Sequence, residues 1–134
     1  MFLDAAAIVA ILSDEAEAER CAAALINAAD PITSAIAVWE AAVALARPDK
    51  LAVALDIASP LVLRFLEDRG VQIRDLPDAS DAAALALDAA RRFRRGPVRL
   101  NLADCFHYAC ARHYGVPILS TADEFRFTDI QTVP

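Results

Sequence analysis

The sequence contains few of the residues that build stapled folds or phosphate-binding loops. Its three cysteines, Cys21, Cys105 and Cys110, are odd in number and show no C-x-x-C spacing. We therefore expect neither a disulfide framework nor a zinc framework. There are only three glycines, with no Gly-rich phosphate loop and no G-x-S-x-G motif. The sequence therefore gives no support for a P-loop or a serine nucleophile.

Linkers and membrane-spanning segments are also missing. No Gly/Ser-rich or Pro-rich tract divides the 134 residues, which predicts a single domain over residues 1–134. The N-terminal run MFLDAAAIVAIL carries Asp4, lacks a basic region and is too short to span a bilayer. We therefore expect a cytoplasmic protein without membrane contact.

Positive charge is scarce. The formal net charge is −6 and Lys50 is the only lysine, which argues against nucleic-acid binding through bulk positive charge. The arginines are nevertheless clustered within nine residues, at Arg91, Arg92, Arg94, Arg95 and Arg99. The dipole of a preceding helix favours cations at its end, and contact with RNA phosphates is the alternative interpretation.

The hydrophobic share of 57% exceeds the usual range of about 45–50%. Alanine supplies much of the excess, but some apolar surface should remain for a partner. We expect a homodimer or a tight heteromeric complex.

Hydrophobic periodicity and capping residues predict alternating strands and helices. We expect helices over Asp14–Ala29, Ala35–Ala46 and Asp81–Arg95, and short strands at 1–3, 31–33, 71–76, 118–119 and 128–133. This alternation implies an α/β fold with a mainly parallel central sheet flanked by helices.

Four acids occupy unusual places in this pattern. Asp4 and Asp123 each follow a short apolar strand, Asp104 opens a nearly all-apolar helix, and Glu40 is the lone charge of the helix 35–46. Because parallel strands send their carboxyl ends to one edge, where open α/β sheets bind ligands, the acids could converge. Ordinary interpretations also exist, since aspartate is a common helix cap and Glu40 could simply reach the rim.

Converging carboxylates repel one another, and a hard divalent cation such as Mg²⁺ or Mn²⁺ relieves the repulsion. The chemistry that uses such a cluster is commonly in-line displacement at phosphate. His107 and His113 lack metal-ligand spacing, so we expect both to lie outside the site as core or surface residues.

Two other classes of protein remain open at this point. A phospho-receiver domain is also a small acidic α/β unit, but it needs a lysine after a late strand, and Lys50 lies between helical segments. A domain that grips RNA or a protein without cutting is the second alternative.

Four segments carry a resemblance to a known family. They are FLDAAAIVAIL, SAIAVWEAAVALAR, LNLADCFHYACA, and PILSTADEF followed by TDI. In this order and spacing they resemble a PIN-domain ribonuclease, specifically the toxin of a VapBC-type toxin–antitoxin pair. The resemblance implies a PIN-like α/β/α sandwich and a Mg²⁺- or Mn²⁺-dependent endoribonuclease acting on RNA. It also implies a homodimer and a partner antitoxin whose segment covers the site.

The resemblance also assigns roles to residues. It gives catalytic and metal-binding roles to Asp4, Glu40, Asp104 and Asp123. Asn101 and Thr121 take supporting roles. The family often has a small hydroxyl residue two positions after the first aspartate, where this chain has Ala6. If that hydroxyl orients a ligand, its absence weakens metal binding, since such losses cost about 10–100-fold.

Overall fold

The computed structural model describes residues 1–95, 99–121 and 123–133. Within them the strands are β1 (Phe2–Leu3), β2 (Ile32–Ser34), β3 (Gln72–Arg74) and β4 (Ile118–Leu119). The helices are α1 (Ala5–Leu12), α2 (Ala18–Ile26), α3 (Ala35–Leu45), α4 (Leu55–Asp68), α5 (Ala79–Phe93), α6 (Leu102–Tyr114) and the short 3₁₀ helix η1 (Asp123–Phe127). The alternation of strands and helices follows the order predicted from the sequence.

The four strands form one parallel sheet in the order β3-β2-β1-β4, which confirms the predicted mainly parallel sheet. The predicted strand at 128–133 is wrong in extent, because only a single parallel bridge joins Thr132 to Ile118. The Thr128 hydroxyl donates to the carbonyl of Phe125 and accepts from the backbone N–H of Ile130, and these two bonds hold residues 125–130 in a turn. Only the last few residues therefore reach β4.

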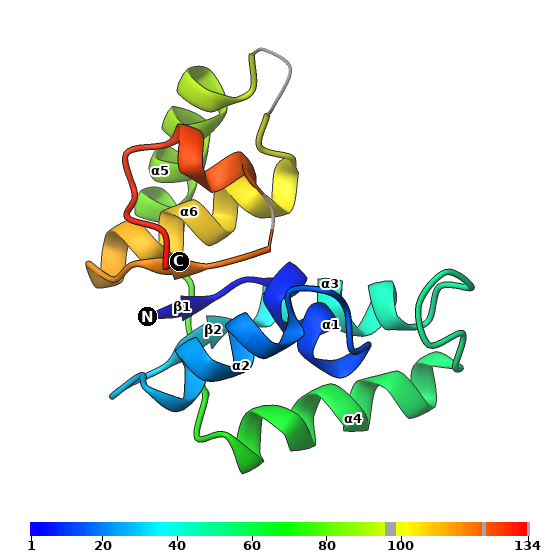
Figure 1. Cartoon of the computed structure of the whole chain (residues 1–134). Coiled ribbons are helices and arrows are strands. Elements are labelled where there is room, and N and C mark those ends of the chain that lie inside the picture. The colour runs from blue at the N-terminus through cyan, green and yellow to red at the C-terminus, as the bar shows by residue number, and fades with distance from the viewer. Residues whose placement is uncertain (96–98, 122, 134) are drawn as a thin grey trace.

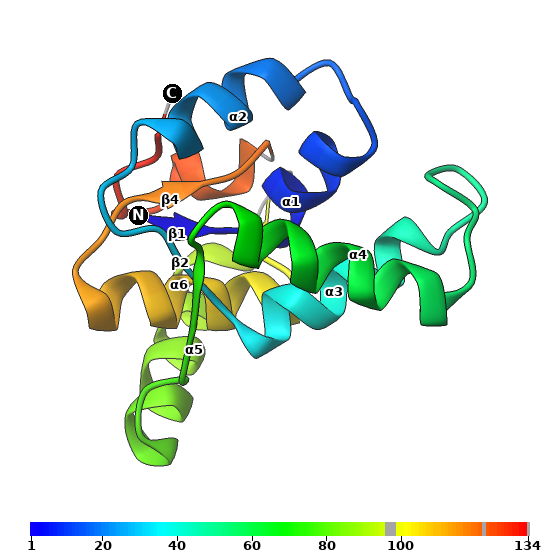
Figure 2. The same cartoon turned by 90° about the horizontal axis from the view of Figure 1, so that it is seen from below.

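Helices cover both faces of the sheet (Figures 1 and 2). The helices α5 and α6 pack together on one face, and α1, α2 and α4 lie on the other. The helix α3 runs outward beyond the carboxyl end of β2 and contacts α1, α4 and α6. The arrangement is an α/β/α sandwich in which α3 bridges the two helical layers.

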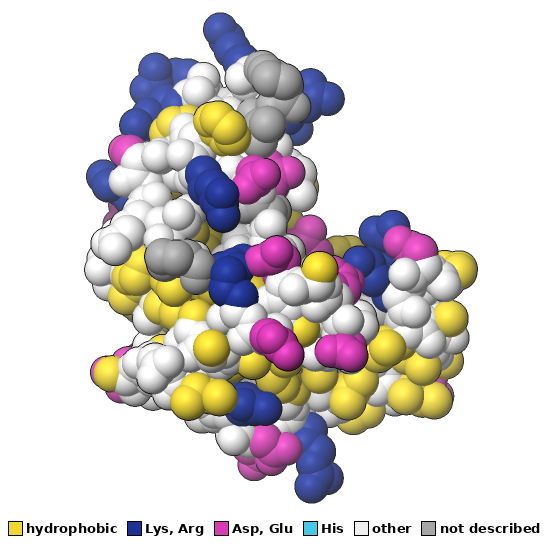
Figure 3. Space-filling model, in the orientation of Figure 1, with side chains coloured by type: hydrophobic (Ala, Val, Ile, Leu, Met, Phe, Trp, Pro, Cys, Tyr) yellow, Lys and Arg dark blue, Asp and Glu magenta, His cyan; other side chains and the backbone are white. Residues whose placement is uncertain are grey.

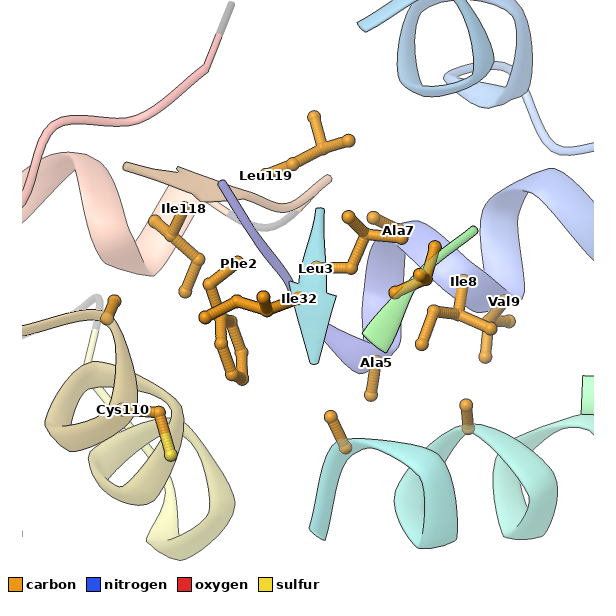
Figure 4. Close-up of a cluster of buried hydrophobic side chains, with 14 of the residues drawn as sticks. Phe2, Leu3, Ala5, Ala7, Ile8, Val9, Ile32, Cys110, Ile118 and Leu119 are labelled. Atoms are coloured by element: carbon orange, nitrogen blue, oxygen red, sulfur yellow. The ribbon is translucent and has the colours of Figure 1, made fainter. Parts of the chain in front are cut away.

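The core lies between the sheet and these helices (Figure 4). Successive strand side chains point to opposite faces, so Phe2 points toward Cys110 of α6 while Leu119 points to the other side. Phe2, Leu3, Ile118 and Leu119 are all fully buried. Short strands buried on both faces are typical of parallel sheets, whereas the edge strand β3 is exposed.

The strand ends determine where polar side chains can gather. Asp4 follows β1, Ser120 follows β4, and Ser34 ends β2 and caps α3 by accepting a hydrogen bond from the backbone N–H of Ala37 at 3.3 Å. The carboxyl edge of the sheet is therefore the polar edge.

No helix among the described residues is long and apolar enough to cross a membrane.

Candidate active site

A pocket opens at the carboxyl edge of the sheet. Its acidic lining residues are Asp4, Glu15, Glu40, Asp104 and Glu124. Asn101, Thr121 and Lys50 also line it. Figure 3 shows acidic side chains gathered in the hollow between the part of the molecule that carries α5 and α6 and the part that carries the α3–α4 loop. Three of the four acids singled out from the sequence thus share one pocket.

Asp4 is a buried carboxylate rather than a plain helix cap. It occupies the N-cap position of α1 with extended backbone, but its side chain makes no capping hydrogen bond. The side chain of Ser120 instead donates to Asp4 Oδ2 at 2.6 Å, and His107 Nδ1 lies 2.6 Å from Asp4 Oδ1. Since the Asp4 residue is only 2% exposed, its charge depends on these two neighbours.

His107 is a buried core residue, one of the two predicted alternatives, but it also contacts two of the pocket acids. The side chain is fully buried, and its Nε2 lies 3.7 Å from Glu40 Oε2, so the ring stands between two carboxylates. Neither ring nitrogen has an aligned hydrogen-bond partner among the described residues, and neither does Asp4 Oδ1. The contact with Asp4 is therefore ionic. The signal in the sequence was the spacing, because His107 lies one helical turn after Asp104.

Asp4, Glu40 and His107 offer ligand atoms that all lie within 4.8 Å of one another, a grouping that can hold a metal ion. Both interpretations of Glu40 hold, since its side chain is 31% exposed at the pocket rim and also faces the imidazole of His107. His113 is exposed at the end of α6, where its ring packs edge-on against Tyr114. It lies outside the site, as expected.

Asp104 combines a structural role with a place in the pocket. The backbone N–H of Asn101 donates to Asp104 Oδ2 at 2.6 Å, and the backbone N–H of Asp104 donates to Asn101 Oδ1 at 3.0 Å. This reciprocal pair is a capping box that begins α6. The cap fixes the carboxylate in the first turn, where it faces Asp4 and Glu40 across the pocket.

The crowding shifts the pKa values of the acids. Burial raises the pKa of Asp104 to about 6, and the charge of Asp4 adds to the effect. Burial likewise raises the pKa of Glu40, assisted by the charges of Asp4 and Asp104. Burial acts in the same direction on Asp4, but His107 and Ser120 together hold the pKa of Asp4 below its ordinary value. Burial disfavours a charged His107, yet the surrounding carboxylates raise the pKa of His107.

Asp123 is not brought together with the other three acids. It begins η1, is exposed, and its Oδ1 lies 3.4 Å from Arg126 Nη1. The physical reason is that β4 ends at Leu119, so the turn starting at Asp123 faces solvent, while Glu124 lines the pocket instead. Thr121, predicted as a supporting residue, does line the pocket.

Ala6 also lines the pocket, without the hydroxyl that the family often carries there. The hydroxyl that contacts the Asp4 carboxylate comes from Ser120, which the sequence reasoning missed. A serine that directly follows a predicted buried strand was the available signal.

The arginine cluster divides into engaged and free side chains. Arg92 donates to Asp129 Oδ2 at 2.8 Å, to Asp88 Oδ2 at 3.3 Å and to the Tyr108 hydroxyl at 3.2 Å. Arg91 donates to Asp88 Oδ1 at 2.6 Å. In contrast, Arg94, Arg95 and Arg99 are exposed, and no ion pair with another described residue holds them. The contacts of Arg92 with Tyr108 and Asp129 tie α5 to α6 and to the C-terminal segment.

This division predicts two different mutant phenotypes. Replacing Arg94, Arg95 and Arg99 together by Gln should reduce the salt dependence of single-stranded RNA binding by about 2, because each lost phosphate contact removes ~0.7 from the slope. Replacing Arg92 by Gln should instead lower the melting temperature, because it breaks the network with Asp129. Binding titrations across a salt series and melting curves measure the two effects. An unchanged slope in the triple variant would make the cluster a helix-end feature only.

The fold and the pocket define an α/β domain with carboxylates gathered where a parallel sheet binds its ligands. The model of the family described as the PIN domain matches residues 1–131. Ribonuclease VapC42 of Mycobacterium tuberculosis is 37% identical over 134 residues, covering 98% of this chain and 97% of the relative. The chain belongs to the PIN domain family and, within it, to the VapC ribonucleases.

Solved structures agree on the fold. VapC20 of Mycobacterium tuberculosis, described as a toxin that cleaves the sarcin-ricin loop, has a TM-score of 0.76 at 16% identity and covers 98% of this chain and 97% of that chain. A toxin–antitoxin complex from Klebsiella pneumoniae has a TM-score of 0.65 at 15% identity and covers 92% of this chain and 88% of that chain. At these identities the likeness establishes the fold alone, and the predicted PIN-like sandwich is confirmed.

Proposed function

We propose that this chain cleaves RNA with a divalent cation held by Asp4, Glu40 and Asp104, and that it acts as the toxin of a toxin–antitoxin pair. The observation that carries the proposal is the convergence of these three carboxylates on one pocket at the carboxyl edge of the sheet. Gathering like charges in a partly buried pocket costs free energy. A cation bound between the carboxylates would offset this cost.

The donor set fits a hard cation. Carboxylate oxygens from three different elements face one pocket, and oxygen donors suit Mg²⁺ or Mn²⁺. Burial is the main cause of the raised pKa values of Glu40 and Asp104, and the neighbouring carboxylates add to it; a cation beside these acids would favour their charged forms. We therefore assign Mg²⁺ or Mn²⁺ as the cofactor.

A cation bound there supplies Lewis-acid activation of water and stabilises charge on the leaving oxygen. Within the chain, Ser120 and His107 hold the Asp4 carboxylate in place, and Asn101 fixes Asp104 through the capping box. Thr121 lines the pocket beside them. These contacts preorganise the acids before substrate arrives.

Asp123 is proposed as an outer acid of the same site. Its ion pair with Arg126 is exposed, with side chains 62% and 67% accessible, and such pairs contribute only about 0–1 kcal/mol. The turn can therefore release this carboxylate toward the pocket at little cost. Asp123→Asn should lose a smaller part of the Mn²⁺ stabilisation than the changes at Asp4 and Asp104.

Incubating the protein with RNA in Mn²⁺ and in EDTA tests the function. We expect cleavage in Mn²⁺ alone, with products carrying a 5′-phosphate and a 3′-hydroxyl, because water attacks phosphorus in line and expels the 3′ oxygen. Products ending in a 2′,3′-cyclic phosphate would contradict this, since they require attack by the 2′-hydroxyl of the RNA. RNA that is bound but left intact in Mn²⁺ would favour a binding-only domain.

We also propose an antitoxin as a partner, with a segment that covers the acidic pocket, and a homodimer. An exposed apolar groove between α3 and α4, lined by Trp39, Leu55, Leu63 and Ile73, supports a protein partner. Light scattering of the free chain, with an expected mass twice the 14.4 kDa of one chain, tests the homodimer. We propose that this chain and its antitoxin act in the cytoplasm.

A further inference from the structure

The single lysine of the chain stands at the acidic pocket. Among the described residues that line this pocket, Lys50 alone carries a positive charge. Its ammonium group pairs with Glu15, which also lines the pocket, and the two side chains are 25% and 34% exposed. The pair is thus partly open to solvent and lies on the same wall as the acids proposed to hold the cation.

A residue with left-handed backbone lies close in sequence to each member of the pair. Glu15 follows Asp14, whose φ is 53°, and its N–H donates to the carbonyl of Ala10 at 3.0 Å. On the other side, Ala52 has a φ of 51°, and its N–H donates to the carbonyl of Arg47 at 3.1 Å. Left-handed backbone is disfavoured for alanine, and strain of this kind gathers at functional positions.

The electrostatics of the pocket leave a specific task for Lys50. An RNA backbone is anionic, and the acids that line the pocket repel it. A cation held by Asp4, Glu40 and Asp104 would neutralise part of this negative charge. The Glu15 carboxylate lines the same pocket and pairs with Lys50. A lysine ammonium is a suitable donor to phosphate oxygens. Because a partly exposed pair contributes little, Lys50 can exchange the Glu15 carboxylate for a phosphate at small cost.

We infer that Lys50 binds a phosphate of the RNA next to the one that is cut, and that Glu15 holds the Lys50 side chain in place until RNA arrives. The inference rests on the proposed function. It makes Lys50 a substrate-binding residue and Glu15 its competitor. The two residues therefore have opposite effects on RNA affinity, although they form one ion pair.

The test compares Lys50→Gln with Glu15→Gln, using a labelled single-stranded RNA 20-mer of random sequence. Binding is measured in Ca²⁺, which takes the same oxygen ligands, and cleavage is measured in Mn²⁺. Lys50→Gln should weaken binding and raise KM about tenfold, lower the salt slope by ~0.7, and leave kcat within about twofold. Glu15→Gln should strengthen binding and lower KM about threefold, because it releases the ammonium group.

Melting curves supply the readout for a structural pair. Both changes break the same contact, so both should lower the melting temperature slightly, whatever happens to RNA. If RNA affinity falls in both variants or changes in neither, the pair is structural only and the inference is overturned. Lys50→Arg should retain the parent affinity, because arginine also binds phosphate.

A matched control lies on the same loop. Arg47 pairs with Asp49 at 2.8 Å and does not line the pocket. Arg47→Gln should leave KM and the salt slope unchanged. An effect equal to that of Lys50→Gln would assign the result to general surface charge and overturn the inference. A parent that binds RNA in Ca²⁺ but never cleaves it in Mn²⁺ would refute the nuclease, while the binding arm still decides the role of Lys50.

Discussion

Replacing Asp104 with Asn should raise the melting temperature in EDTA and remove most of the stabilisation that Mn²⁺ gives the parent. In the metal-free protein burial raises the pKa of the Asp104 carboxylate to about 6, and the charge of Asp4 adds to the effect. Asparagine keeps the oxygen that accepts from the backbone of Asn101, so the capping box survives. Loss of the charge then relieves repulsion, on the order of 1 kcal/mol after solvent screening.

The sign of this effect depends on pH. An acid with a raised pKa binds more protons in the folded state between its ordinary pKa of 3.8 and the folded value of about 6. Stability of the parent therefore falls as pH rises through this window. The advantage of Asp104→Asn should be absent below about pH 4 and complete above about pH 6.

In Mn²⁺ the order of stability reverses. A cation at about 100 times its Kd adds about 2.7 kcal/mol to the parent, and the variant should lose most of this gain. RNA cleavage should fall about 100-fold or more, since even the loss of an outer contact costs ~10–100-fold. Asp4→Asn should also lose the Mn²⁺ stabilisation, but it should lower the melting temperature in EDTA, because the lowered pKa of Asp4 means that its charge stabilises the metal-free fold. Full Mn²⁺ stabilisation in Asp104→Asn would remove Asp104 from the ligand set.

Asp81 provides a matched control. It occupies the same position in the first turn of α5, three residues after the N-cap Asp78, but it is exposed and does not line the pocket. Asp81→Asn should lose only about 0.3–1 kcal/mol of helix-dipole energy. The loss should be equal in EDTA and in Mn²⁺, which separates a metal site from a helix cap.

Replacing His107 with Leu should destabilise the metal-free protein by about 3 kcal/mol, because it leaves the buried carboxylate of Asp4 without its counter-charge. In a domain of this size the change lowers the melting temperature by roughly 10 °C. Leucine fills most of the imidazole volume, so the effect is mainly electrostatic. Thermal melting in EDTA measures it.

The pH dependence of this effect also has a definite sign. Asp4 has a lowered pKa, so its contribution is present above the ordinary value of 3.8 and is lost as pH falls through the folded pKa. His107 has a raised pKa, so its contribution is present below the ordinary value of 6.5 and is lost as pH rises through the folded pKa. The penalty of His107→Leu should therefore be largest between those two values.

A second substitution separates lost charge from lost packing. Asp4→Asn combined with His107→Leu should recover much of the stability, because a neutral amide needs no counter-charge. His113→Leu, on the exposed end of the same helix, should change the melting temperature little. If the double variant is as unstable as the sum of the single ones, the histidine serves packing and not charge.

Local patterns were enough to predict the fold and three of the five acids that line the pocket. Alternating strand and helix signals predicted the parallel sheet, because strands that alternate with helices pair in parallel. Asp4, Glu40 and Asp104 were predictable because each is polar where its own element should be apolar, and their convergence followed from the shared carboxyl edge of parallel strands. The capping box of α6 was visible as Asn101 followed three residues later by Asp104.

The contacts that give these acids their chemistry were decided by tertiary structure. His107 looked like a core residue, and only the packing of α6 against β1 puts its ring beside Asp4. Ser120 and Asp4 are 116 residues apart, and Lys50 and Glu15 are 35 apart, distances over which no helical or strand period carries information. The position of Asp123 outside the pocket lining was not predictable, because a turn that follows a strand has no periodicity of its own. The sequence by itself determined the elements and the edge where the acids gather, since these follow from local burial. The tertiary structure alone decided which side chain neutralises which, because a charge pair depends on side chains a few ångströms apart whose positions are set by the whole packed core.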